Sequence, residues 1–156
     1  MTTTLTAATL TVTVKESIEL NGGEQGATNE KTISSVNEIS KRIVTVTTSE
    51  VEVIAMGTAI AAGTFIEGDV RYMRFTNLDD TNFVTLTFKN ENDDEFAVKL
   101  DAGYSFVYPA DNSDGVVDTM DAIDGTGLTL SLGDLVNVMA IADTASCDME
   151  IFVASI

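Results

Sequence analysis

Apolar and polar residues alternate with a period of two along the stretch from Val70 to Leu100. Val84, Leu86 and Phe88 fall on one face of this stretch, and the run that ends at Leu100 repeats the pattern. Alternation over runs of this length predicts half-buried strands. Only short acidic, Asn-rich segments join the three runs, whereas helical crossovers need longer connections. We therefore expect an antiparallel meander here.

The same alternation recurs along the rest of the chain and is interrupted by turn residues. The run from Tyr104 to Tyr108 is closed by Pro109, which cannot donate to a strand ladder. Further strands are expected over residues 10–14, 18–20, 32–39, 41–47, 51–55, 116–123, 128–132, 135–141 and 147–153. Residues 56–68, rich in small side chains, fit a loop or one short helix. Roughly ten short strands without a convincing helix predict an all-β fold, an antiparallel β-sandwich or jelly roll.

The N-terminal region differs in composition from the rest of the chain. Seven of the first thirteen residues are threonine, large apolar side chains are sparse, and Asn21-Gly22-Gly23 indicates a turn. We predict two units, an N-terminal arm or set of edge strands over residues 1–47 and a β-sandwich domain over residues 48–156. A segment with so little core of its own is expected to dock on a neighbouring copy.

Composition narrows the class of protein. A chain of 156 residues with 44% hydrophobic residues suits one folded domain with a real core. No apolar run approaches the length of a transmembrane helix, and the N-terminus does not match a signal peptide. The single cysteine, Cys147, shares a strand face with Met149 and Ile151, so we expect it in the core rather than in a disulfide.

The formal net charge of −17 is unevenly distributed. Residues 1–77 carry nine acids and six bases, whereas residues 78–156 carry sixteen acids and two bases. Such a surface repels nucleic acids and anionic membranes, so neither is an expected partner. High acidity favours solubility in a salty habitat, and it also suits a basic partner or divalent cations.

The residue types that usually carry catalysis are scarce. Histidine and tryptophan are absent, so acid–base chemistry would depend on shifted carboxylates or lysines. A glycosidase with paired carboxylates is conceivable, but no cleft can be recognised. We therefore expect a protein without enzymatic activity.

Acidic turns are the one candidate for a cofactor site. Asp111, Asp114 and Asp118 lie close together in the sequence, and calcium prefers carboxylate and amide oxygens. With Gly115 at the glycine position of a calcium loop, however, the first ligand would be Ala110. Because β-turns use Asp and Asn in any case, we expect no cofactor, with calcium as the alternative.

Basic and aromatic side chains are the candidates for an assembly interface, because specific interfaces depend on apolar and aromatic contacts within a polar rim. These candidates are Lys41, Arg42, Phe65, Ile66, Tyr104, Tyr108 and Phe152. Arg71 and Arg74 fall on opposite faces of one strand, so one of them points inward and should need a carboxylate partner.

Three segments, Thr28–Val46, Val70–Tyr108 and Leu130–Ala154, resemble small virion structural proteins of tailed bacteriophages, especially marine ones. The resemblance lies in the overall residue pattern and in short runs of residues rather than in a diagnostic motif. It implies a non-enzymatic capsid decoration or cement protein, made in the bacterial host cytoplasm and located in the virion. The implied partners are further copies of itself, for example in a trimer, and the major capsid protein or other virion proteins.

Other functions remain open from the sequence. A neck, tail or fibre component would have the same composition as a decoration protein. A calcium-dependent carbohydrate-binding β-sandwich is an alternative of another class, and an acidic mimic of nucleic acid is a further one.

Overall fold

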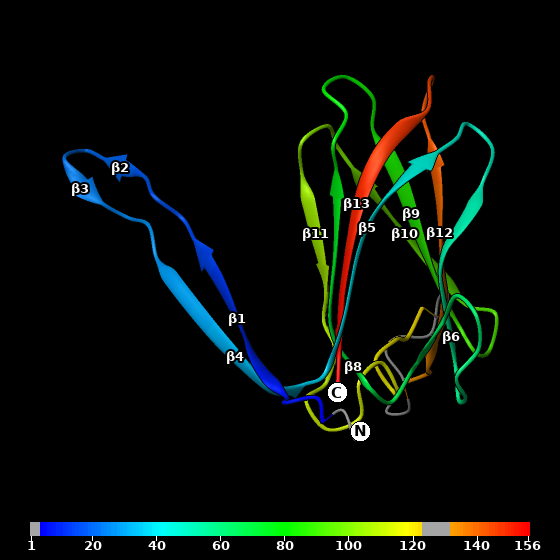
Figure 1. The fold of residues 1–156 in the computed structure, drawn as a ribbon. Coiled ribbons are helices and arrows are strands. Elements are labelled where there is room, and N and C mark those ends of the chain that lie inside the picture. Colours follow the sequence, from blue (N-terminus) through cyan, green and yellow to red (C-terminus); the bar gives the residue numbers. More distant parts are fainter. Residues whose placement is uncertain (1–3, 123–131) are drawn as a thin grey trace.

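A computed structural model describes residues 4–122 and 132–156, and these residues form a β-sandwich with a long projecting hairpin (Figure 1). No helix occurs in the described part of the chain. The predicted all-β sandwich of antiparallel sheets is confirmed.

The sandwich consists of two packed sheets. The first contains, in spatial order, β10 (Glu95–Leu100), β9 (Val84–Asn90), β12 (Leu135–Ala142), β6 (Val51–Gly57) and β7 (Thr64–Ile66). The second contains β11 (Ser105–Tyr108), β8 (Val70–Asn77), β13 (Cys147–Ser155) and β5 (Glu38–Val46). All neighbours are antiparallel except β6 and β7, which pair in parallel.

The stretch from Val70 to Leu100 does not form a meander, because β8 and β9 lie in different sheets. Only β9 and β10 form a hairpin, with Lys89 opposite Glu95. The connection over residues 78–83 crosses between the sheets and is held by the buried Asn77. The Asn77 amide nitrogen donates to the carbonyl oxygen of Asn82 at 2.9 Å. A period of two predicts which face is buried, but it does not predict the sheet to which the next strand belongs.

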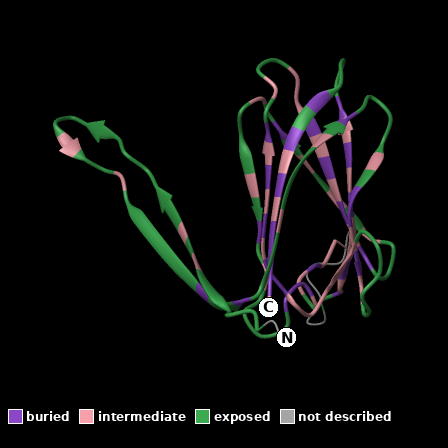
Figure 2. Cartoon of the chain, in the orientation of Figure 1, coloured by how far each residue is buried: buried purple, intermediate pink, exposed green. Residues whose placement is uncertain are grey.

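The core lies between the two sheets, and the predicted inward faces are the buried ones (Figure 2). Val84, Leu86 and Phe88 are fully buried, as are Cys147 and Met149. The Phe88 ring is the centre of an aromatic cluster, with ring centroids at 4.9 Å from Phe96, 5.1 Å from Tyr108, 5.3 Å from Phe106 and 5.8 Å from Phe75. The sandwich therefore has an ordinary close-packed interior.

The projecting hairpin, here called the arm, consists of β1 (Ala8–Lys15) and β4 (Thr28–Val36). Two short strands, β2 (Glu19–Leu20) and β3 (Gly23–Glu24), form its tip. The turn predicted there is present: Asn21 (φ 54°) and Gly22 (φ 78°) both adopt the left-handed conformation that two-residue hairpin turns need.

The N-terminal unit predicted over residues 1–47 contains both of the forms that the sequence allowed, an arm and an edge strand. The arm ends at Val36, and β5 pairs along its whole length with β13 as an edge strand of the sandwich. A bulge in β4 marks the junction, since Ala8 pairs with Val36 but Leu10 with Ile33. Ser35 in this bulge has φ 62°, so the chain turns sharply where the arm begins.

Two other segments differ from their predicted secondary structure. Residues 116–122 form no strand and are held by a bridge between Met120 and Gly133. Residues 56–68, predicted as a loop or one short helix, contain no helix and instead include the end of β6, a turn and the whole of β7. Of the strand predicted over residues 128–132, all but Leu132 lies outside the described residues.

Candidate assembly surface

Only the base of the arm is packed against the sandwich. Ile33 and Val36 are buried there, and together with Leu10 and Val12 they contact a small cluster around Ala154. Beyond this base the arm is exposed along both strands (Figure 2). An isolated two-stranded ribbon is only marginally stable in water. The outer part of the arm therefore has no packing partner among the described residues of the sandwich.

The two faces of the arm differ in chemistry. Cross-strand partners share a face, so Leu10 and Ile33, Val12 and Lys31, and Val14 and Asn29 lie on one side. The opposite side carries Thr11, Thr13, Lys15, Thr28, Glu30 and Thr32. The first side is the apolar face of the arm, and its inner end is the part that packs on the sandwich.

This apolar face meets the outer surface of the four-stranded sheet, here called the outer face. Tyr72 and Phe152 form its aromatic centre, with an edge-to-face contact at 5.9 Å between ring centroids. The strand register places Ile39, Lys41, Ile43, Arg74, Val107 and Glu150 on the same face. Ile39, Ile43 and Val107 are exposed there.

An ion-pair cluster crosses the outer face. Glu150 is bonded to the Arg74 guanidinium at 2.5 Å and to the Lys41 ammonium at 3.5 Å. The hydrogen bond from Arg74 is the main reason that the pKa of Glu150 lies below its ordinary value of 4.5. The cluster supplies two positive charges for one negative charge on a protein that is otherwise strongly acidic.

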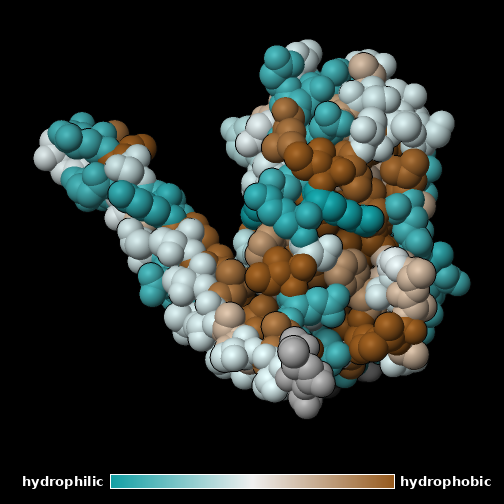
Figure 3. Space-filling view, viewed as in Figure 1, coloured by the Kyte–Doolittle hydropathy of each residue, from teal (hydrophilic) through white to brown (hydrophobic). Residues whose placement is uncertain are grey.

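The angle between arm and sandwich is hollowed. A pocket of about 330 Å³ is lined by Tyr72, Arg74 and Phe152 on the sandwich and by residues 10–13 on the arm. In Figure 3 apolar side chains gather at the base of the arm and on the adjoining sandwich surface, and a hydrophilic band crosses the sandwich above them. The surface that faces the arm is thus partly apolar and only partly covered.

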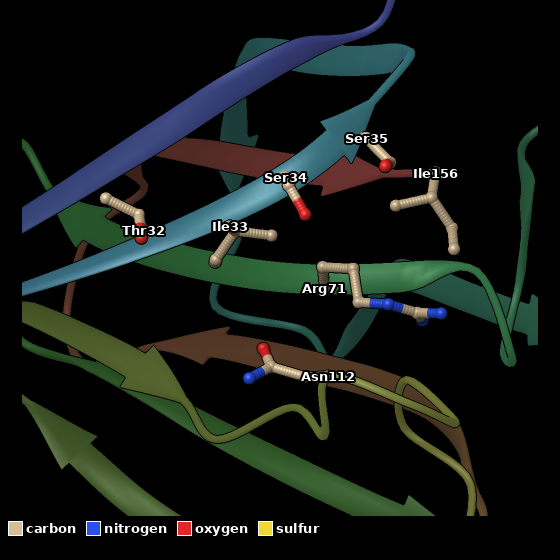
Figure 4. A pocket seen from close by; sticks show the side chains of 7 residues that line it. All are labelled: Thr32, Ile33, Ser34, Ser35, Arg71, Asn112 and Ile156. Atoms are coloured by element: carbon tan, nitrogen blue, oxygen red, sulfur yellow. The ribbon is translucent and has the colours of Figure 1, made fainter.

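A second pocket, of about 230 Å³, lies at the arm junction. Figure 4 shows Arg71 of β8 there, with Ser34 and Ser35 of β4 on one side and Asn112 on the other. Arg71 is buried, and its guanidinium donates to the backbone carbonyls of Gly68, Val70 and Ser113 at 2.6, 3.2 and 3.0 Å. The expected carboxylate partner is replaced by loop carbonyls, which satisfy the same donors.

The predicted interface residues fall into different places. Lys41 and Phe152 lie on the outer face, as described above. Arg42 donates to the carbonyl oxygen of Val53 and so ties the edge strand to the opposite sheet. Tyr108 is wrong as a contact residue, because it is only 2% exposed and its hydroxyl is bonded to Thr119 at 3.0 Å.

The remaining interface candidates lie away from the arm's apolar face. Phe65 and Ile66 are half-buried in β7 and line a pocket of about 350 Å³ that also contains Ile60 and the C-terminal Ile156. Tyr104 is exposed in the turn before β11. The structure therefore does not bring the predicted candidates together on one surface.

The calcium candidates have local structural roles. The Asp111 carboxylate accepts backbone N–H bonds from Ser113 at 2.6 Å and Asp114 at 3.2 Å, and these bonds lower the pKa of Asp111. The backbone N–H of Asp118 donates to the side chain of Asp134 at 2.8 Å. Across residues 4–122 and 132–156, no group of three or more His, Cys, Asp or Glu side chains could hold a metal ion.

Sequence reasoning missed the exposed apolar residues of the outer face, Ile39 and Ile43. A usable signal was present, because the alternation in β5 sets Ile39, Lys41 and Ile43 against Val44 and Val46. Both faces of β5 carry apolar residues, so the alternation alone does not show which of the two faces is buried and which is exposed.

No protein-family profile matches the chain, and no curated protein matches it significantly. One structural neighbour comes from work described as "Bacillus endospore appendages form a novel family of disulfide-linked pili". It shares 11% sequence identity with this chain at a TM-score of 0.41, covering 76% of this chain and 84% of the other. A likeness of this size supports no inference about activity or partners. None of the described residues forms a helix long and apolar enough to cross a membrane.

Proposed function

We propose that this chain is a non-enzymatic structural subunit of a bacteriophage particle, acting as a capsid decoration or cement protein, and that its arm binds another subunit. The resemblance of the sequence to virion proteins suggests the setting. The single observation that carries the assembly role is the arm, whose apolar face is packed at its base only within residues 4–122 and 132–156.

The argument for a partner is energetic. Val14, Ile18 and Leu20 on the outer part of the arm are each at least half exposed. Covering such side chains is favourable by about 25 cal/mol per Å² of apolar surface. A hairpin that is marginal by itself gains that stabilisation only when another surface covers it.

The charge distribution agrees with an arm that meets other subunits of an acidic protein. Residues 8–46 carry four bases and five acids, a net charge of −1. The rest of the chain carries four bases and twenty acids, a net charge of −16. Like charges repel across an interface, so copies of this chain approach each other most easily through the arm and β5.

The test is an arm-shortened variant in which residues 14–29 are replaced by Asn-Gly. Thr13 and Glu30 are cross-strand partners, so this replacement closes the hairpin and keeps the packed base. Removal of residues 1–47 would be unsuitable, because it also deletes β5 from the sandwich. We expect the variant to fold with an unchanged thermal transition but to lose its association with other subunits.

Incorporation into particles is measured separately. Phage particles produced with the full-length or the arm-shortened chain are purified, and the copies per particle are counted by quantitative mass spectrometry. The proposal requires many copies over the shell and a loss of incorporation in the variant. A small fixed number of copies would instead indicate a neck or tail component, and absence from particles would refute a virion role.

A further inference from the structure

We infer that the outer face of the four-stranded sheet is the docking surface for the arm of a second copy, so that two copies clasp each other reciprocally. This inference rests on the proposed function only in taking the arm as a subunit-binding element. It adds the identity of the partner and the surface that receives the arm.

The first argument is continuity with a contact that the chain already makes. The inner end of the apolar arm face, Leu10 and Val12, packs beside Tyr72 and Phe152. Farther out on the same face of the ribbon, Val14 is 50% exposed, and its cross-strand neighbour there is the polar Asn29. The apolar face of the arm and the outer face of the sheet are in contact at the base of the arm, and they diverge farther along it (Figure 1).

The second argument is that the outer face has its own uncovered apolar residues. Ile39 and Ile43 are 59% and 62% exposed, and they flank Lys41 on β5. They lie on the same side of the sheet as Phe152, since Lys41 is its direct cross-strand partner. Apolar side chains with a charged rim are the composition expected of a specific interface.

The third argument identifies the occupant. A basic partner would be attracted to the part of the chain that carries the net charge of −16, not to the arm and β5. The surface proposed here combines an arm of net charge −2 over residues 8–36 with a sheet face on which Lys41 and Arg74 balance Asp148 and Glu150. An acidic protein that binds itself needs such a surface, so we assign the second copy as the occupant.

The fourth argument concerns symmetry. Beyond the packed base, the eight residues from Val14 to the turn at Asn21 make a ribbon at most ~26 Å long and ~10 Å wide, so one arm docked on one face buries about 500 Å² in total. Stable interfaces need roughly 1,000 Å² or more, which two reciprocal contacts about a two-fold axis provide. The proposed assembly is therefore a symmetric dimer in which the arm of each copy binds the outer face of the other.

Analytical ultracentrifugation of the full chain and of the double variant Ile39→Thr/Ile43→Thr tests the receiving surface. Threonine keeps the β-branched shape at exposed strand positions, so the fold is retained. We expect the double variant to weaken dimerisation at least about tenfold. The matched control, Ile60→Thr, alters an even more exposed isoleucine outside the outer face and should leave dimerisation unchanged.

Mixing two defective chains separates this inference from the proposed function. The arm-shortened variant keeps the receiving face, and the double threonine variant keeps the arm. Each should be monomeric alone, and their mixture should form a heterodimer that is weaker than the native dimer because it has one contact in place of two. If the double threonine variant still dimerises as tightly as the native chain, the outer face is not the docking surface. That result would leave the proposal of arm-mediated assembly standing.

Cross-linking checks the pairing directly. With cysteines introduced at Leu20 and Ile43, oxidation should give a covalent dimer, since the native Cys147 is buried. A disulfide within one monomer would show that the arm folds onto its own sheet. That result, or a native chain that stays monomeric up to near-millimolar concentration, would refute the inference.

Discussion

Asn77→Ala should be among the most destabilising single substitutions of a polar residue in this protein. The Asn77 side chain is fully buried at the end of β8 and makes three hydrogen bonds to backbone groups. Its amide nitrogen donates to the carbonyls of Asn82 at 2.9 Å and Leu100 at 3.2 Å, and its oxygen accepts the N–H of Asp79 at 3.0 Å. These bonds hold the crossing between the two sheets.

The magnitude follows from the burial of the three partners. Leu100 is buried, so its carbonyl would be left without water, at a cost of about 1–3 kcal/mol. Asp79 and Asn82 are partly exposed, so their groups can be hydrated and lose only about 0.5–1 kcal/mol each. We therefore expect the free energy of unfolding to fall by about 2–5 kcal/mol.

Urea unfolding followed by far-ultraviolet circular dichroism measures this loss. Asn92→Ala, at an exposed asparagine in the β9–β10 turn, is the control and should change stability by less than about 0.5 kcal/mol. Asn77→Asp should be at least as damaging as alanine, because its carboxylate would face two carbonyl oxygens. A loss below about 1 kcal/mol for Asn77→Ala would refute the role of this side chain in holding the crossing.

Three further predictions use other features of the structure. Gly115→Ala should destabilise the fold by about 3 kcal/mol or more in thermal or urea unfolding, because φ is +68° and a Cβ would lie 2.3 Å from the Glu67 carbonyl oxygen. The control is Gly63→Ala, where φ is +76° but no atom lies close to the added Cβ, and its free energy of unfolding should fall by only about 1 kcal/mol. The stability advantage of the native chain over Glu150→Gln should be constant above pH 4.5 and disappear as the pH falls through the lowered pKa of Glu150, and an advantage that grows on acidification would contradict the assigned ion pairs. Dimerisation, measured by ultracentrifugation, should strengthen as salt rises, because salt screens the repulsion between two chains of net charge −17, and weakening by salt would indicate an interface dominated by ion pairs instead.

The candidate surface could be predicted from the sequence only in part. Of the predicted contact residues, Lys41 and Phe152 lie together on the outer face, and their role in an interface stays a prediction. Tyr104 and Tyr108 share one alternating run, yet Tyr104 is exposed and Tyr108 is buried. Alternation assigns a side chain to a face, but its exposure also depends on how far along the strand the opposite sheet extends.

The arm shows the same limit. Its low apolar density and its turn at Asn21-Gly22 were visible in the sequence, because both are local properties. Its end at Val36 was not, because β5 belongs to the sandwich through pairing with β13 at the other end of the chain. Local composition is similar on both sides of that boundary, so no local signal marks it.

The sequence by itself determined the strand class, the inward faces of β9 and β13, and the turns, since each depends on neighbours a few residues away. The tertiary structure decided the sheet to which each strand belongs, the crossing held by Asn77, and the meeting of the arm with Tyr72 and Phe152. These features depend on pairings between segments that are distant in sequence. Such pairings are selected by the packing of the whole core, which no local period records.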